Sequence, residues 1–158
     1  MTVDEAAALI ADPRIDGTTW ADLGCGDGTF TRALAALLPP GGVIHAMDRD
    51  RRVLAGIPRS SSGTSIVTHT GDFTEFPWPF AGLDGVLLAN ALHYVRDQAA
   101  FIRACAPALT RRRFLIVEYD TDQANPWVPY PISRRALKEL FTAAGYQSFA
   151  VLGSRPSV

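Results

Sequence analysis

Three glycines spaced two residues apart, Gly24, Gly26 and Gly28, directly follow a short apolar stretch that ends at Leu23. Glycine has no Cβ, so a turn with several glycines can adopt left-handed backbone and approach a ligand closely. From Thr29 the apolar residues recur at helical spacing, so the turn leads into a helix whose first N–H groups face the same crevice. A strand, a glycine turn and a helix in this order predict a bound nucleotide.

The spacing of the glycines, and the acid before them, narrow the kind of nucleotide. A dinucleotide fingerprint is G-x-G-x-x-G, whereas this turn is G-x-G-x-G, with Thr29 where the last glycine would stand. Asp22 lies two residues before the first glycine, at the end of the expected strand. A carboxylate at that point would repel a pyrophosphate but would favour a ligand that carries an ammonium or a sulfonium.

The stretch from Asp22 to Gly28, DLGCGDG, resembles the first motif of the class I S-adenosylmethionine-dependent methyltransferases. The resemblance implies S-adenosylmethionine as the cofactor, with Asp22, Gly24, Cys25 and Gly26 around it. Taken alone, the glycine pattern is equally compatible with an ordinary strand-to-helix turn. The interpretation therefore depends on whether further motifs follow in the family's order.

Three later strand ends match the same family in order and spacing. Asp48 and Arg49 end the second expected strand, where the resemblance implies a carboxylate that binds a ribose diol. Asp72 and Phe73 follow the third strand, where the family binds adenine through a carboxylate and a backbone N–H. Asn90, after the fourth strand, is implied near the methionine part. Each motif alone has a plainer interpretation, such as a helix cap or a turn, but their joint order favours the cofactor site.

The chemistry that the resemblance implies is an in-line displacement, in which an O, N, S or C nucleophile attacks the methyl carbon. The protein would contribute mainly by aligning and desolvating the reactants. A hydroxyl acceptor would benefit from a general base, and His93 is the candidate catalytic residue because imidazole ordinarily changes charge near neutral pH. His93 could instead pack or orient its loop. Glu118, Tyr119 and Asp120, at the end of the fifth strand, are alternative bases.

Aromatic side chains near these strand ends are the candidate substrate contacts. Tyr94 follows His93 directly, Tyr119 follows the fifth expected strand, and Trp127 lies in an aromatic, proline-rich segment at residues 123–131. That segment is either a lid over the acceptor or a packed loop.

Strands and helices alternate along the chain, and this order positions the candidate residues. Most expected strands are continuous apolar runs, which favours a parallel sheet covered by helices on both faces. The first expected strand ends at Leu23, the others cover residues 43–47, 65–70, 83–89, 114–118 and 146–152, and the expected helices cover residues 6–11, 29–38, 50–57, 97–109 and 133–145. A T-x-x-E capping box at Thr2 starts the first helix, and residues 60–63 and 71–79 are expected loops.

The predicted fold class is therefore α/β: a Rossmann-like, doubly wound, mostly parallel sheet in one domain over residues 1–158. The resemblance implies the class I methyltransferase form of this fold. That form normally ends with an antiparallel strand between the fifth and sixth strands, and no such strand is evident in this sequence.

Composition and charge argue against several classes of protein. The formal net charge is −1, so no global field recruits nucleic acid or an anionic membrane. No apolar run reaches the roughly 18 residues of a membrane span, and the start lacks a signal-peptide pattern, so we expect a cytoplasmic protein. The two cysteines are far apart and no carboxylate cluster joins the three histidines, so we expect no metal site.

The sequence thus predicts an enzyme that transfers a methyl group from S-adenosylmethionine to a small or medium-sized molecule, and a homodimer is one form open to it. One alternative is a non-catalytic adenosylmethionine-binding module that acts with a protein partner. A nicotinamide-dependent oxidoreductase is a further alternative, against which the missing third glycine counts.

Overall fold

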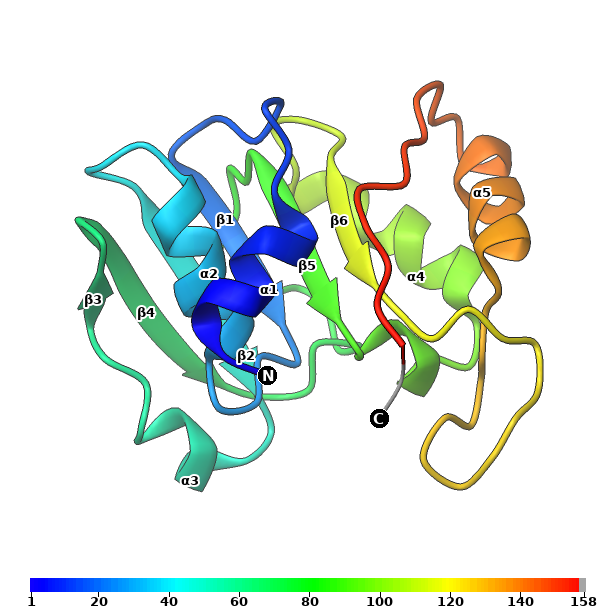
Figure 1. The fold of residues 1–158 in the computed structure, drawn as a ribbon, viewed down its shortest axis with the longest axis horizontal. Helices are drawn as coiled ribbons and strands as arrows, with labels where there is room; N and C mark the ends of the chain where they lie inside the picture. Colours follow the sequence, from blue (N-terminus) through cyan, green and yellow to red (C-terminus); the bar gives the residue numbers. More distant parts are fainter. Residues whose placement is uncertain (157–158) are drawn as a thin grey trace.

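The computed structural model describes residues 1–156, which form one six-stranded sheet with helices on both faces (Figure 1). The strands are β1 (Thr19–Leu23), β2 (Val43–Asp48), β3 (Ser60–Ser61), β4 (Thr64–Thr70), β5 (Gly85–Ala89) and β6 (Phe114–Val117). Their order across the sheet is β3-β4-β2-β1-β5-β6. All neighbouring pairs are parallel except β3 and β4, which are antiparallel. This architecture confirms the predicted fold class.

Five α-helices accompany the sheet. They are α1 (Val3–Ile10), α2 (Thr29–Leu37), α3 (Arg51–Leu54), α4 (Gln98–Cys105) and α5 (Arg134–Ala143), with short 3-10 turns η1 (Leu92–Tyr94) and η2 (Ala106–Ala108). Side chains of α1 and α2 pack in one apolar cluster, whereas those of α4 and α5 pack in another on the opposite face. The sheet therefore lies between two helical layers, as Figure 1 shows.

The sequence of β1 shows why this strand lies at the centre. Trp20 is fully buried in the cluster beneath α1 and α2, while its neighbour Ala21 and then Leu23 belong to the cluster on the other face. Successive side chains of a strand point to opposite faces of the sheet. A strand that is apolar on both faces must therefore be covered by other elements on both faces.

Local signals in the sequence account for most helix ends. The Thr2 and Glu5 capping box is formed, and Asp50, Asp97 and Ser133 cap the helices that follow them. The helix expected over residues 97–109 ends at Cys105 and continues as the 3-10 turn η2, which contains Pro107. Proline lacks an N–H, so this distortion agrees with the prediction. The helix after Asp50 is shorter than expected.

One expected loop is a β-hairpin instead. Residues 60–63 contain the two-residue strand β3, which turns through Ser62 and Gly63 to pair with β4. Both turn residues have positive φ, 50° and 78°, the backbone that a two-residue hairpin loop requires.

The predicted sixth strand at residues 146–152 is wrong. This segment contains no strand, and Phe149, Val151 and Leu152 are exposed. The chain passes β6 (Figure 1) and reaches α1, where Gly153 packs against Leu9. A short run of apolar residues favours a strand only when a partner supplies backbone hydrogen bonds and cover, and this segment has no paired strand among residues 1–156.

None of the helices in the described part of the chain is long and apolar enough to cross a membrane.

The close approach of β5 to Trp20 gives a test of the packing. A Cβ at Gly85 would lie 2.4 Å from two ring carbons of Trp20, which is fully buried. We expect Gly85→Ala to lower the free energy of unfolding by about 1–3 kcal/mol, the usual cost of overpacking. Urea denaturation measures this loss.

The matched control is Gly56→Ala, because a Cβ there would meet only the carbonyl of Val53 at an ordinary 3.5 Å. It should change stability by no more than about 0.5 kcal/mol. Equal effects of the two variants would contradict this account of the packing.

Candidate functional site

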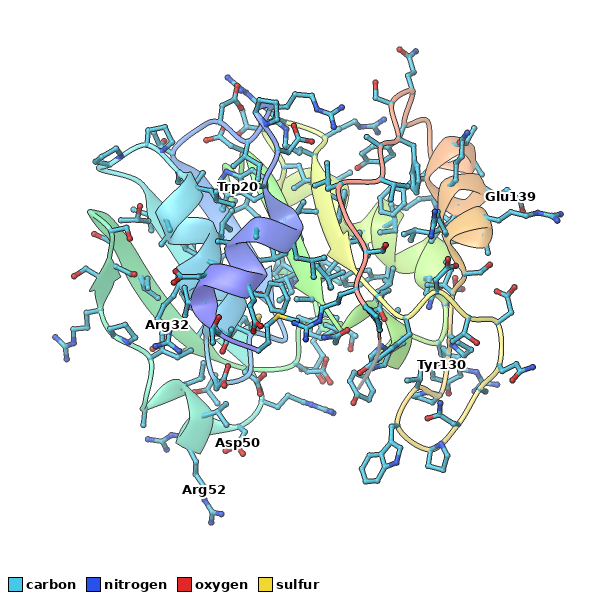
Figure 2. The ribbon with its side chains drawn as sticks, in the orientation of Figure 1. Trp20, Arg32, Asp50, Arg52, Tyr130 and Glu139 are labelled. Carbon is cyan, nitrogen blue, oxygen red and sulfur yellow. The ribbon has the colours of Figure 1, made fainter. Side chains whose placement is uncertain are left out.

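The parallel strands all end at the same edge of the sheet, and the predicted site residues follow them there. Asp22 and Asp48 lie at the ends of β1 and β2, Asp72 follows β4, Asn90 follows β5 and Glu118 follows β6. Figure 2 shows Asp50 and Tyr130 toward the lower edge of the view, with Trp20 toward the upper edge. Ligands of open α/β sheets bind outside this carboxyl edge.

The glycine turn is held against the end of β2. The backbone N–H groups of Gly24 and Cys25 donate to the carbonyl of Met47, at 2.8 and 3.1 Å. Gly24, Gly26 and Gly28 have φ values of 72°, 52° and 78°, so each adopts the left-handed backbone that the sequence predicted.

The first two glycines serve different purposes. A Cβ at Gly24 would lie 2.9 Å from the Cβ of Ala91 and 3.2 Å from the ring of Phe73, so this glycine is needed for packing. At Gly26, no atom of residues 1–156 lies within 4 Å of such a Cβ. The backbone of Gly26 therefore borders open space, as a turn that approaches a ligand must.

Asp48 connects the turn to β2 through both carboxylate oxygens. Oδ2 accepts from the N–H of Gly26 at 2.9 Å, and Oδ1 accepts from the N–H of Asp50 at 2.9 Å. Asp50, rather than Asp48, caps α3 by accepting from the N–H of Arg52. A carboxylate has about four acceptor positions, so Asp48 keeps capacity for ligand hydroxyls.

Asp22 is fully buried beneath the turn. Its Oδ2 accepts from the hydroxyl of Thr31 at 2.6 Å, whereas its Oδ1 is buried without a hydrogen-bond partner among the described residues. Burial raises the pKa of Asp22 to about 7; the Thr31 hydrogen bond opposes this shift and the charge of Asp48 adds to it. A buried acceptor in this state is stabilised by a donor or a cation.

Cys25 is also buried. Burial, reinforced by the charges of Asp22 and Asp48, raises the pKa of its thiol. The thiol therefore stays protonated at neutral pH and is no nucleophile.

Asp72 lies near Arg49 on the other side of the turn. Its Oδ1 accepts from the N–H and the hydroxyl of Thr74, at 2.9 and 2.6 Å, and Arg49 Nη1 lies 3.6 Å from its Oδ2. Burial opposes ionisation, but these hydrogen bonds and the Arg49 charge outweigh it, so the pKa of Asp72 is lowered. The side chain of Phe73 packs in the core, which leaves its backbone as the part able to meet a ligand.

Asn90 follows β5 in a strained conformation. Its φ is 53°, and its N–H donates to the carbonyl of Val117 at 2.7 Å. Positive φ outside glycine is uncommon and is concentrated at functional sites.

His93 and Glu118 form a buried pair, which sequence reasoning did not identify. The Nδ1 atom of His93 lies 2.6 Å from Glu118 Oε2, and the backbone N–H of His93 donates to Oε1 at 3.1 Å. Glu118 was considered only as an alternative base. Its place directly after a strand next to β5 was the signal available in the sequence.

The three aromatic candidates lie around this pair to different degrees. The rings of Tyr94 and Tyr119 are centred 4.4 and 6.0 Å from the His93 ring, whereas Trp127 is 80% exposed. Tyr119 and Trp127 share an open pocket of about 320 Å³, whose lining is completed by Thr121, Asn125 and Val128. Since Val128 is buried, the segment at 123–131 is anchored as a packed loop with an exposed tip.

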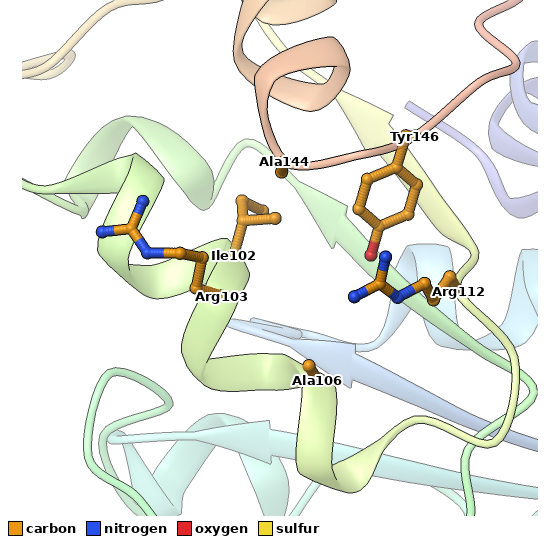
Figure 3. Close-up of a pocket in the computed structure, with 6 residues that line it drawn as sticks. All are labelled: Ile102, Arg103, Ala106, Arg112, Ala144 and Tyr146. Atoms are coloured by element: carbon orange, nitrogen blue, oxygen red, sulfur yellow. The ribbon is translucent and has the colours of Figure 1, made fainter.

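A second pocket, of about 210 Å³, lies away from these residues. It is bordered by α4, η2 and α5, with Arg112 beside Tyr146 (Figure 3). The neighbouring Arg111 and Arg113 both pair with Asp16, near the start of β1. Arg111 and Arg113 therefore lie at the edge of the sheet opposite the candidate site residues.

His45 and His69 lie together on β2 and β4, away from His93. Their Nδ1 and Nε2 atoms are 2.9 Å apart, and both rings pack against Phe80. Within residues 1–156, no three His, Cys, Asp or Glu side chains gather in a way that could hold a metal ion.

The burial of Asp22 predicts a specific pH dependence. Its folded pKa of about 7 exceeds the ordinary value of 3.8, so between these pH values the folded state holds a proton that the unfolded state has lost. Wild-type stability should therefore fall as pH rises from about 4 to 7. Asp22→Asn keeps an acceptor for Thr31 and removes this term, so its stability relative to wild type should rise by up to about 1.4 kcal/mol per pH unit in that window.

Asp27→Asn is the control in the same turn. Hydrogen bonds from Thr29 lower the pKa of Asp27, so its stabilising effect is lost only as pH falls through the acid range. The difference between Asp27→Asn and wild type should be constant from pH 5 to 8. Urea denaturation across this pH range measures both differences. If the stability difference between Asp22→Asn and wild type did not change with pH, the raised pKa of the buried Asp22 carboxyl would be contradicted.

Comparisons with known proteins agree with this geometry. The family described as "Methyltransferase domain" matches residues 21–112, more than half of the chain. No curated protein sequence matches closely enough to count as a relative.

Solved structures show the same fold. An S-adenosylmethionine-dependent methyltransferase from Leishmania major is 22% identical with a TM-score of 0.68, and the match covers 90% of this chain and 61% of that protein. Magnesium protoporphyrin IX methyltransferase from Synechocystis, solved with bound S-adenosylmethionine, is 19% identical with a TM-score of 0.64, covering 92% and 67%. A putative methyltransferase from Haloferax volcanii, in complex with the Trm112 activator, is 22% identical with a TM-score of 0.64, covering 91% and 67%.

The chain thus spans about three fifths of the length of the Leishmania protein. The family match begins inside β1, includes the glycine turn and the ends of β2, β4 and β5, and stops just before β6. The strand order and the carboxyl-edge site belong to the same architecture. On this evidence the chain belongs to the class I S-adenosylmethionine-dependent methyltransferase family.

Proposed function

We propose that this chain transfers a methyl group from S-adenosylmethionine to a nucleophilic O, N, S or C atom of a small or medium-sized molecule. The observation that carries the proposal is the pairing of a buried, half-unsatisfied carboxylate with a glycine turn that borders open space. The family match then supplies the ligand that such a site would take.

The residues present fit that cofactor. The free Oδ1 of Asp22 suits a cationic group, because a buried acceptor without a donor is costly. The open side of Gly26 offers backbone N–H and carbonyl groups at close range, which a side chain would block. An anionic pyrophosphate would instead meet the negative charges of Asp22 and Asp48.

Other strand ends supply the remaining contacts in this proposal. Asp48 would hold the ribose diol with the acceptor positions that the turn leaves free. Asp72, ionised and flanked by Arg49, would accept from the adenine amine, with the backbone of Phe73 beside it. Asn90 would lie near the methionine part.

The bound cofactor supplies a methyl group on a positively charged sulfur, and that charge is lost on transfer. The protein's contribution is then to align the acceptor and exclude water from the reacting atoms. In this proposal His93 would receive a proton from a hydroxyl acceptor; its ring lies at the carboxyl edge beside two aromatic side chains.

Composition supports the wider proposals of a cytoplasmic, single-domain protein with a small-molecule acceptor. Cys25 and Cys105 are both buried free thiols, as is usual in a reducing compartment. The net charge of −1 gives no general attraction to nucleic acid.

Catalysis is tested with methyl-labelled S-adenosylmethionine and a panel of alcohols, phenols, amines and thiols. Labelled product from one of these classes is expected. Tight cofactor binding without any labelled product would support a non-catalytic binding module instead.

The turn itself is tested with Gly26→Val. A branched side chain would fill the open space beside the backbone, so binding of S-adenosylhomocysteine should be abolished. Isothermal titration calorimetry on the folded variant measures this loss.

Gly41→Val is the matched control. Gly41 also has positive φ, 92°, and no atom of the described residues lies within 4 Å of its Cβ position, but it precedes β2 at the opposite edge. Both variants should lose some stability through backbone strain, and only Gly26→Val should lose affinity. Near-native affinity in Gly26→Val would mean that the turn is purely structural.

A further inference from the structure

Glu118 fixes both the position and the protonation of the His93 ring. One carboxylate accepts from two donors of the same residue, the backbone N–H at 3.1 Å and Nδ1 at 2.6 Å. The side chains are only 3% and 5% exposed. Since a carboxylate only accepts, the proton of neutral imidazole must lie on Nδ1. The other nitrogen, Nε2, then carries a lone pair.

The Nε2 atom is available to a ligand. No residue between 1 and 156 forms a hydrogen bond with it, and it does not belong to the buried unpartnered atoms of this part of the chain. The titratable groups around the ring are Glu118 from the end of β6, Tyr94 from η1 and Tyr119. The carbonyl of His93 also accepts from the N–H of Tyr130, which ties the ring's backbone to the neighbouring loop.

A pocket that has Tyr119 in its lining, whose ring is centred 6.0 Å from that of His93, has the chemistry of a site for a flat, neutral molecule. Tyr119, one of its walls, is the side chain that also borders His93. All five lining residues are uncharged, and two of them are aromatic. Asn125 Oδ1 accepts from the N–H groups of Trp127 and Val128, at 2.9 and 3.0 Å, so the loop that presents the Trp127 indole is ordered before any ligand arrives.

We propose that His93, Glu118 and this pocket form an acceptor site for phenol-class compounds, an inference that rests on the proposed methyl transfer. The aromatic ring of the acceptor packs against Tyr119 and Trp127, and its hydroxyl donates to His93 Nε2. Glu118 is a positioning residue that acts through His93.

The step balances without any further reactant. As the acceptor oxygen bonds to the methyl carbon, its proton passes to Nε2. The carbon–sulfur bond breaks with its electron pair on sulfur, which leaves a methyl ether and a neutral thioether. The imidazolium, stabilised by Glu118, then returns its proton to solvent.

The test uses 4-methylphenol, which is neutral at pH 7, as the probe and 4-methylanisole as its matched control, because the ether has the same ring but no proton to donate. Protein labelled with ¹⁵N at histidine contains three imidazoles, and His93→Gln assigns the signals of His93. Titrations are run with and without S-adenosylhomocysteine, whose own binding is measured by calorimetry.

We expect His93 to show the Nδ1-protonated form and its Nε2 signal to move toward the protonated range with 4-methylphenol but not with 4-methylanisole. In Glu118→Gln, the amide can accept from only one of the two donors that the carboxylate now satisfies, so the proton should distribute between both ring nitrogens. Glu139→Gln, on the exposed face of α5, should change nothing.

Trp127→Ala should weaken binding of both probes about 2- to 10-fold, the range for one aromatic contact. Phe149→Ala, which removes an exposed aromatic side chain from the C-terminal segment, should leave binding unchanged. The site is contradicted if 4-methylphenol moves no His93 signal in either titration, or if the two alanine variants behave alike. Loss of S-adenosylhomocysteine binding would contradict the proposed methyl transfer separately.

Discussion

The attachment of the glycine turn to the end of β2 is the interaction on which the site depends. Met47 accepts from two successive N–H groups of the turn, and the Asp48 carboxylate accepts from a third at Gly26. These bonds fix the turn in left-handed backbone with its open side outward. They also bring Asp22 and Asp48 close enough for the second charge to raise the pKa of the first. The same contacts therefore determine both the backbone conformation of the glycine turn and the electrostatic environment of Asp22.

The carboxyl edge of the sheet has two halves in our proposal, one for the cofactor and one for the acceptor, and they are built differently. The cofactor half consists of strand ends and a turn that the sheet holds rigidly. The acceptor half consists of η1, Glu118 and the loop that carries Trp127, whose indole projects into solvent. Binding residues on loops over a rigid scaffold can vary without cost to the core. In the proposed reaction, the loop side that would bind the acceptor is therefore the part that can vary, while the glycine turn is held by the end of β2.

The sequence predicted the α/β fold class and the position of the candidate cofactor residues at strand ends, because both depend on local patterns: apolar runs, glycines and acids. The pairing of His93 with Glu118 depends instead on β5 lying next to β6, which places Ala89 opposite Val117. No local pattern contains that register. The strand prediction for residues 146–152 was wrong for a related reason: a short apolar run does not show whether a neighbouring strand is available. The missed hairpin before β4 had a usable signal in Ser62-Gly63, a common two-residue turn.

The most direct test of the account compares S-adenosylmethionine with NAD in thermal denaturation of the wild-type chain. A ligand that binds only the folded state stabilises it by RT ln(1 + [L]/Kd), or about 2.7 kcal/mol at 100 times Kd. We predict that S-adenosylmethionine raises Tm progressively with concentration, whereas NAD does not, because its pyrophosphate would meet Asp22 and Asp48. A rise in Tm with NAD and none with S-adenosylmethionine would contradict the assignment of the glycine turn and its buried acid to a sulfonium cofactor.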